Sequence, residues 1–201
     1  MRYIQRWSLM RNSQEENLQE HSLEVAYFAH ALALIRSEIL CLQPQASAER
    51  CVLLALYHDI SEIITGDLPT PIKYFNKQIN SSFKEVEEEA LRLMLKGLPQ
   101  KLAACYEDYI FQEGFPSELE NSALSPAQLE AKIVKAADTL SAYIKCLDEK
   151  AFGNYEFKDA EESTLSKLKS YNLPELDWFI EHCLPDFALT LDELRNSDNS
   201  H

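Results

Sequence analysis

Apolar residues recur along this chain at intervals of three and four, the spacing that gathers them on one face of an α-helix. The two-residue alternation typical of β-strands is nearly absent, and only four glycines interrupt the pattern. The pattern therefore predicts an all-α fold. The helices are expected at about residues 18–40, 48–65, 76–95, 99–112, 126–152, 156–171 and 174–183.

Polar residues and prolines mark where several of these helices begin and end. Asn17, with a glutamate three residues on, is typical of a capping box at a helix N-terminus. Ser125 and Pro126 indicate a second start, with serine as the cap and proline in the first helical position. Gly66 is expected to end the second helix. The two prolines in residues 67–71 predict a rigid loop, because proline is poorly tolerated inside a helix.

Length and composition indicate one globular domain. The chain has 201 residues, of which 46% are hydrophobic and 26% are charged, values typical of soluble proteins. No apolar run approaches the roughly 18 residues of a membrane span, and the N-terminus lacks the apolar region of a secretory signal. We expect a single domain over residues 1–201, located in the cytoplasm, with a loop at 113–125 and a frayed tail at about 196–201.

The net charge of −14 narrows the classes of partner. A surface this acidic repels DNA, RNA and anionic membranes, so neither a nucleic-acid polymer nor a membrane is expected to bind. A phosphate-bearing substrate would have to be small and meet a local cation. The five cysteines form no CxxC or other zinc spacing, and we expect them to be buried free thiols.

Residues able to carry chemistry gather at positions 57–62, which read YHDISE. On one helix, Glu62 shares a face with both His58 and Asp59, because the spacings are four and three. The preceding residues 52–56 are apolar, so this cluster adjoins the core, where an adjacent histidine and aspartate are costly to bury. A metal ion would satisfy both side chains. An isolated His-Asp pair, however, is more often a solvated pair at a helix end.

Two further positions strengthen the metal interpretation. His21 lies early in the first predicted helix. Asp138 lies midway along the helix expected at 126–152, among apolar neighbours, where a lone aspartate is unfavourable both for helix propensity and for burial. Those neighbours disfavour the alternative for Asp138, which is a solvated helix face.

The order His…His-Asp…Asp resembles that of the HD-domain phosphohydrolases, an all-helical superfamily with a divalent metal site. More narrowly, the sequence is similar to the bacterial 5′-deoxynucleotidase branch over nearly its whole length, least specifically at about residues 85–125. The motifs that carry the resemblance are RWSLMRN at 6–12, EHSL at 20–23, YHDISE at 57–62, TGDLPTPIKYFN at 65–76, KAAD at 135–138, AY at 142–143 and KCL at 145–147. Glu24 departs from the neutral amide expected in relatives, and no role is assigned to it.

The resemblance implies a single HD-domain helical bundle with one divalent metal ion. The implied ligands are His21, His58, Asp59 and Asp138. Mixed imidazole and carboxylate ligands suit Mn, Co, Fe, Ni or Zn better than Ca, and the resemblance implies Co²⁺ or Mn²⁺. Four protein ligands on a six-coordinate ion would leave places for water and a phosphate oxygen.

Three residues are predicted to act on the substrate. Glu62 is the candidate general base, because it should share the metal-facing side of its helix; a supporting or solvated charge is the alternative. The resemblance makes Arg6 the phosphate clamp, since a guanidinium can bind two phosphate oxygens, whereas an N-terminal arginine alone would read as a solvated cation. The resemblance places Asp67 against the nucleotide, where it is expected either to protonate the leaving 5′-oxygen or to hold the sugar, the alternative being an aspartate that begins a turn.

The remaining substrate residues follow from the same resemblance. The full expected set is Arg6, Trp7, Asp59, Asp67, Leu68, Pro69, Thr70 and Asp138. Trp7 is expected to form a wall against C2′ that rejects a ribose hydroxyl, although a core anchor is the usual role of such a tryptophan. Lys73 is a weaker second cation, for which a solvated lysine is the ordinary account. Four aromatic residues are expected in the core and not as base-stacking platforms: Tyr57, Tyr74, Phe75 and Tyr143.

The predicted reaction is hydrolysis of 2′-deoxynucleoside 5′-monophosphates to deoxynucleoside and phosphate, by a protein that the resemblance implies is a homodimer. Two alternatives stay open. A nucleoside triphosphate hydrolase of the same superfamily would need several cations, and the motifs supply mainly Arg6, Arg11 and Lys73. A catalytically silent module that binds a nucleotide would not need Glu62 beside a complete set of metal ligands.

Overall fold

The structure, a computed structural model, describes residues 1–73, 75–111, 123–189 and 192–193. Over these residues it contains helices and one isolated antiparallel bridge, but no β-strand, which confirms the all-α prediction. The predicted loop at 113–125 lies outside the described residues up to position 122, as do Tyr74 and the predicted frayed tail. The elements are α1 (Leu18–Leu34), η1 (Ile35–Ile39), α2 (Ala48–Tyr57), α3 (Glu62–Thr65), α4 (Thr70–Lys73), α5 (Lys77–Lys96), α6 (Gln100–Ile110), α7 (Pro126–Ala151), η3 (Tyr155–Phe157), α8 (Lys158–Ser170), α9 (Pro174–His182) and η4 (Leu184–Ala188).

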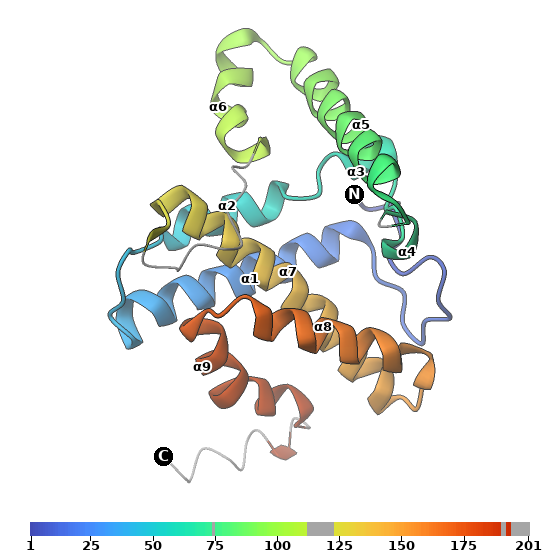
Figure 1. The fold of residues 1–201 in the computed structure, drawn as a ribbon, viewed down its shortest axis with the longest axis vertical. Helices are drawn as coiled ribbons and strands as arrows, with labels where there is room; N and C mark the ends of the chain where they lie inside the picture. The colour runs from blue at the N-terminus through green and yellow to red at the C-terminus, as the bar shows by residue number, and fades with distance from the viewer. Residues whose placement is uncertain (74, 112–122, 190–191, 194–201) are drawn as a thin grey trace.

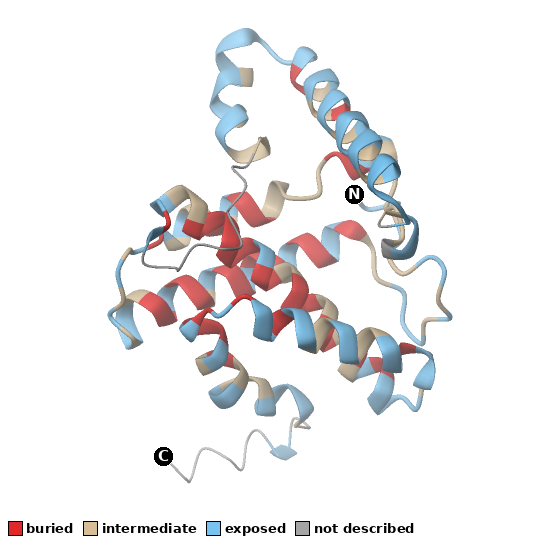
Figure 2. Ribbon diagram, in the orientation of Figure 1, coloured by how far each residue is buried: buried red, intermediate tan, exposed pale blue. Residues whose placement is uncertain are grey.

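The centre of the bundle is formed by α1, α2 and α7 (Figure 1). Helix α8 packs along α7, and α9 packs near the end of α1. Helices α5 and α6 extend from the bundle as a pair and are largely exposed, whereas the buried residues concentrate on the central helices (Figure 2). No helix in the part of the chain that the structure describes is long and apolar enough to cross a membrane.

Small residues allow the central helices to approach closely. Ala26 and Ala29 of α1 and Ala136 and Ala137 of α7 are all buried in one hydrophobic cluster. Larger side chains fill the space around them, among them Leu140, and each such buried residue stabilises the fold by about 1.5–3 kcal/mol. The packing of α1 on α7 fixes how residues on these two helices face one another.

The predicted helix starts are confirmed. The Asn17 side chain accepts hydrogen bonds from the N–H groups of Gln19 and Glu20, and the Glu20 carboxylate accepts from the Asn17 N–H, which completes a capping box. Ser125 caps α7 in the same way, with Pro126 in the first turn. These starts could be read from sequence because each depends on side chains within three residues of the cap.

The first predicted helix changes its geometry before position 40. It is α-helical only to Leu34 and continues as the π-helical turn η1. Here the buried Arg36 pairs with Glu175 of α9 at 3.0 Å and donates to the carbonyls of Gln43 and Pro44. The wider turn accompanies the burial of this guanidinium, whose partners are all distant from it in sequence or outside the helix.

The prediction of one helix over residues 48–65 is wrong. Helix α2 ends at Tyr57, and α3 begins only at Glu62. Between them the backbone makes tight turns in which the N–H of Ile60 donates to the Tyr57 carbonyl and that of Glu62 donates to Asp59. Apolar periodicity continues through this break, so the pattern gave no indication of it. His58 and Glu62 therefore do not lie on one continuous helix.

The loop predicted at 67–71 is also shorter than expected. Gly66 ends α3 with a φ of 73°, a conformation that favours glycine, as the sequence indicated. However, α4 begins at Thr70, so Pro71 lies in its first turn, where a proline is tolerated because its missing N–H would have no helical partner. The loop therefore comprises residues 66–69.

Residues 1–17 form a non-helical segment that is fastened to the far end of α7. The buried Glu149 carboxylate accepts hydrogen bonds from the backbone N–H groups of Ser13 (2.8 Å) and Gln14 (3.3 Å). It also accepts from the Asn154 side chain (2.7 Å) and the Lys145 ammonium (2.6 Å). Glu149 thus ties the segment that carries Arg6 to the bundle.

Two groups of burial predictions are partly wrong. Cys51 and Cys146 are buried as expected, Cys183 is half-buried, and Cys41 and Cys105 are exposed. Cys105 lies on α6, which buries little of its surface because it extends from the bundle. Among the aromatic residues, Tyr143 is in the core and Tyr57 is half-buried, but Phe75 is 77% exposed.

Candidate metal centre

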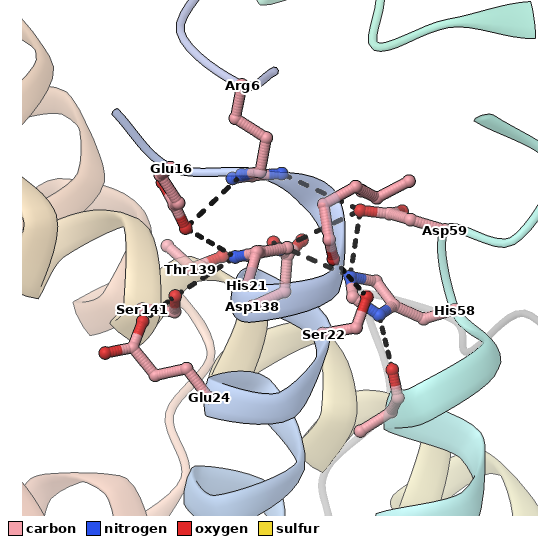
Figure 3. A network of polar contacts seen from close by, with 12 residues as sticks. Arg6, Glu16, His21, Ser22, Glu24, His58, Asp59, Asp138, Thr139 and Ser141 are labelled. Atoms are coloured by element: carbon pink, nitrogen blue, oxygen red, sulfur yellow. Dashed lines mark hydrogen bonds and ion pairs between the residues drawn. The ribbon is translucent and has the colours of Figure 1, made fainter. Parts of the chain in front are cut away.

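Three helices bring the predicted metal-binding side chains together. His21 lies near the start of α1, His58 directly follows α2, and Asp138 lies midway along α7 (Figure 3). One ligand atom from each lies within 4.8 Å of the others. His21 Nε2 is 3.3 Å, and His58 Nε2 4.0 Å, from Asp138 Oδ1.

The unsatisfied atoms of this cluster fit a metal ion. The Nε2 atoms of His21 and His58 are buried and have no hydrogen-bond partner among the described residues. Buried polar atoms are almost always paired, and leaving one unpaired costs about 1–3 kcal/mol. Two imidazole nitrogens facing one carboxylate form a donor set suited to a divalent transition metal, which would satisfy both nitrogens at once.

Asp59 lies beside the same nitrogens. Its Oδ2 is 3.0 Å from His58 Nε2 and 3.8 Å from His21 Nε2. Burial alone would raise the pKa of Asp59, but the adjacent His58 holds that pKa well below its usual value. The sequence-predicted fourth ligand is therefore at the cluster, on the side that faces Arg6.

Hydrogen bonds behind two of the ligands orient them. His58 Nδ1 lies 2.6 Å from the Ala55 carbonyl oxygen, which can only accept, so Nδ1 carries a proton; in the neutral ring the lone pair is then on Nε2, which faces the cluster. Lys135 Nζ lies 2.6 Å from Asp138 Oδ2, which leaves Oδ1 toward the histidines. Burial would raise the pKa of Asp138, but Lys135 lowers it well below its usual value. Sequence reasoning gave Lys135 no role, although its spacing of three from Asp138 on one helix was a usable signal.

The N-terminal segment places Arg6 at the cluster. Gln5 and Asn17 form the isolated bridge, and the Arg6 N–H donates to the Glu16 carbonyl at 2.9 Å. The Arg6 side chain, only 12% exposed, has Nη1 3.7 Å from Asp59 Oδ2 and Nε 3.6 Å from Glu16 Oε1. The predicted phosphate clamp is therefore a buried cation beside the residues that could hold a metal ion.

The Trp7 side chain contacts Glu16 and Phe157. Its indole N–H donates to Glu16 Oε2 at 2.8 Å, and its ring lies 5.2 Å from that of Phe157. Both contacts anchor the N-terminal segment, which is the alternative role that the sequence left open. Glu16, which sequence reasoning missed, also lies 3.3 Å from His21 Nδ1 and so contacts three residues of the site. No local pattern identifies it, because its partners are brought together by the fold of residues 1–17.

Glu62 is buried close to the cluster, and its Oε2 has no hydrogen-bond partner among the described residues. Burial, together with the negative charges of Asp59 and Asp67, raises its pKa to about 9. A cation held among these carboxylates would lower that pKa again. Burial also raises the pKa of Asp67, and the charge of Arg6 opposes that rise.

The other predicted substrate residues lie on the loop that follows α3. Leu68 and Pro69 are half-buried there, and Thr70 is the first residue of α4. Lys73 pairs with Glu87 of α5 at 2.9 Å and lies over the Phe83 ring. Lys73 is therefore engaged with α5, which weakens its case as a second phosphate-binding cation.

Comparisons with known proteins identify the family of this chain. A family model described as 5′-deoxynucleotidase YfbR-like matches residues 1–187. A 5′-deoxynucleotidase of Vibrio vulnificus is 41% identical over 194 residues, covering 96% of this chain and 93% of the relative, and one of Klebsiella pneumoniae is 43% identical, covering 96% and 91%. The crystal structure of an HD-domain phosphohydrolase from Listeria innocua superimposes with a TM-score of 0.74 at 22% identity, covering 92% of this chain and 83% of the other, and shows the same fold. The chain thus belongs to the YfbR-like 5′-deoxynucleotidase family.

Proposed function

We propose that this protein is a metal-dependent 5′-deoxynucleotidase that hydrolyses 2′-deoxynucleoside 5′-monophosphates to deoxynucleoside and phosphate. The observation that supports this most directly is the convergence of His21, His58 and Asp138, with two unpaired nitrogens, next to the buried Arg6. The family relationship supplies the class of reaction.

In this proposal the metal ligands are His21, His58, Asp59 and Asp138. A bound divalent metal would polarise the phosphate and lower the pKa of water. Glu62 accepts the proton of the attacking water, a role for which its unpaired carboxylate oxygen is suited.

The substrate contacts divide between the N-terminal segment and the loop after α3. Arg6 binds two phosphate oxygens, and Asp67 either protonates the departing 5′-oxygen or holds the sugar. The sugar and base then lie against Trp7, Leu68, Pro69 and Thr70. Arg6 lies at the cluster, Lys73 is engaged with Glu87 and Lys135 is engaged with Asp138, so these cations suit a single phosphate more readily than three.

We also propose, from the family relationship, that Co²⁺ or Mn²⁺ is the metal, that the chain forms one HD domain and a homodimer, and that it acts in the cytoplasm. One hydrophobic cluster that includes residues of α1, α2, α7 and α9 supports the single domain. The acidic net charge of −14 supports a small substrate over a nucleic-acid polymer.

The deciding experiment removes the metal with a chelator and restores Co²⁺ or Mn²⁺ while phosphate release from dAMP is followed. Activity should disappear and return. Full activity in the metal-free protein contradicts the proposal. Release of triphosphate from dGTP in preference to hydrolysis of dAMP would identify a triphosphate hydrolase, and binding of dAMP without any hydrolysis would identify a silent binding module.

A further inference from the structure

Behind His21, on the side away from the metal-binding atoms, two side chains form a hydrogen-bonded relay (Figure 3). Ser141 Oγ lies 3.1 Å from His21 Nδ1, and the Ser141 hydroxyl donates to Glu24 Oε2 at 2.5 Å. Ser141 is fully buried. No function proposed above uses either Ser141 or Glu24.

The relay arises from helix geometry. Glu24 lies three residues after His21 on α1, and Ser141 lies three residues after Asp138 on α7. Residues three apart occupy the same face of a helix. Each of these two helices therefore supplies one metal-binding residue and one residue of the relay.

The chemistry of the three groups fixes where the protons lie. An ionised carboxylate can only accept, so the Ser141 hydroxyl gives its single proton to Glu24. Ser141 Oγ can then only accept from His21, which places a proton on Nδ1, so in the neutral ring the lone pair is on Nε2. That lone pair faces Asp138 and His58, where a metal must bind.

We propose that Glu24 and Ser141 are positioning residues that hold His21 in the tautomer and orientation needed for metal binding. The proposal rests on the metal site described under the proposed function. Hydrogen bonds of this kind also make a ligating imidazole more basic, and their loss typically weakens metal binding about 10–100-fold. A neutral amide at position 24 could turn its NH₂ group toward Ser141, and the hydroxyl could then donate to His21 and favour the wrong tautomer.

Glu16 limits the size of the expected effect. Its Oε1 lies 3.3 Å from the same Nδ1, but its carboxylate is shared with Arg6 and with Trp7. Glu16 can therefore retain part of the His21 orientation when the relay is cut. We expect Ser141→Ala to weaken the affinity for Co²⁺ by at least about tenfold, and Glu24→Gln to weaken it less, because an amide oxygen can still accept from the hydroxyl.

The test has two readouts. The first is the ¹⁵N NMR spectrum of the histidine rings in metal-free protein, with the His21 signals assigned by their loss in His21→Gln. At a pH high enough for the His21 ring to be neutral, the wild type should show a protonated Nδ1 and a bare Nε2, and both variants should shift toward a mixture of tautomers. The second is the Kd for Co²⁺, measured by competition with a chelator, with folding checked by circular dichroism.

Two matched controls separate the relay from general effects. Ser22→Ala removes another buried hydroxyl next to His21, one that donates to the Leu18 carbonyl and not to the ring. Asp148→Asn removes a negative charge that lines the same hollow as Glu24 but makes no contact with Ser141 among the described interactions. Both controls should leave the His21 signals and the Kd unchanged.

The outcomes distinguish this proposal from the proposed function. Unchanged His21 signals and unchanged Kd in both folded variants overturn the positioning role, even if the wild type is an active metal enzyme. A wild type that binds no Co²⁺ overturns the metal site instead, and the NMR signals of the metal-free protein still decide whether the relay sets the tautomer. If Ser141→Ala does not fold, Glu24→Gln, which alters a half-buried residue, decides by the same readouts.

Discussion

Replacing Glu149 by glutamine should destabilise the protein markedly, although this residue is outside the proposed metal site. Its carboxylate receives hydrogen bonds from Ser13, Gln14, Lys145 and Asn154. A hydrogen bond to a charged group contributes roughly 1.5–3 kcal/mol, and a glutamine side chain loses the charge and turns an NH₂ group toward one of these donors.

The pKa of Glu149 gives a second way to calculate the loss of folding stability in Glu149→Gln. Lys145 and the Ser13 N–H group more than offset the effect of burial and lower this pKa from 4.5 to about 2. A pKa difference of 1 corresponds to 1.36 kcal/mol, so lowering the Glu149 pKa by about 2.5 corresponds to roughly 3 kcal/mol of folding stability. Both routes therefore give a loss on the order of 3 kcal/mol for Glu149→Gln at neutral pH.

The pH dependence has a definite sign. Because the pKa is lower in the folded protein, the contribution of Glu149 is present above pH 4.5 and is lost as the pH falls toward 2. In urea unfolding, the difference in unfolding free energy between wild type and Glu149→Gln should thus become smaller below pH 4.5. Glu161→Gln is the control, since it removes a more exposed pair with Lys150 and should cost no more than about 1 kcal/mol.

Enzyme activity should also depend on the hydrogen bonds that Glu149 makes to the N-terminal segment. The segment that Glu149 holds carries Arg6, so the KM for dAMP should rise in Glu149→Gln while the Kd for the metal stays near that of wild type. An unfolding free energy of Glu149→Gln within about 0.5 kcal/mol of the wild-type value would refute the reasoning, and so would a difference between the two that does not change with pH.

Four further substitutions test the proposed site. His58→Ala should abolish both stoichiometric metal binding and activity, as measured by metal analysis and phosphate release. Glu62→Gln should keep metal and dAMP bound while kcat falls by about 10²–10⁴-fold; loss of the metal would instead make Glu62 a ligand. Arg6→Ala should raise the KM for dAMP, and unaltered kinetics would remove it from the site. Trp7→Ala should reduce the preference for dAMP over AMP by about ten- to a hundred-fold if the indole excludes the 2′-hydroxyl, whereas equal loss on both substrates would make Trp7 only an anchor.

The parts of the fold that were predicted correctly from the sequence are those that depend on residues close together in the chain. Asn17 and Ser125 cap their helices through bonds to residues two or three positions away, and Gly66 ends α3 through its own backbone conformation. The break after Tyr57 was missed because apolar spacing continues through it. It is visible only in the hydrogen bonds that replace those of a continuous helix.

The site shows the same division. Sequence motifs indicated His21, His58 and Asp138, and the structure brings them together. The residues that support them were not predicted: Ser141 reaches His21 across a separation of 120 residues, and Glu16 depends on how the N-terminal segment folds back. Such contacts are products of tertiary packing, on which local periodicity carries no information.

Because α1 packs closely on α7, neither helix can slide along the other without moving residues of the proposed metal site. Helix α1 carries the proposed ligand His21 and, one turn later, Glu24; helix α7 carries the proposed ligand Asp138 and, one turn later, Ser141, which contacts both His21 and Glu24. Sliding one helix past the other by a single residue moves it about 1.5 Å, more than a hydrogen bond or a metal–ligand bond tolerates. Ala29 of α1 and Ala137 of α7 are buried in the same hydrophobic cluster, so a larger side chain at either position should shift the packing and, with it, the distances among the proposed ligands.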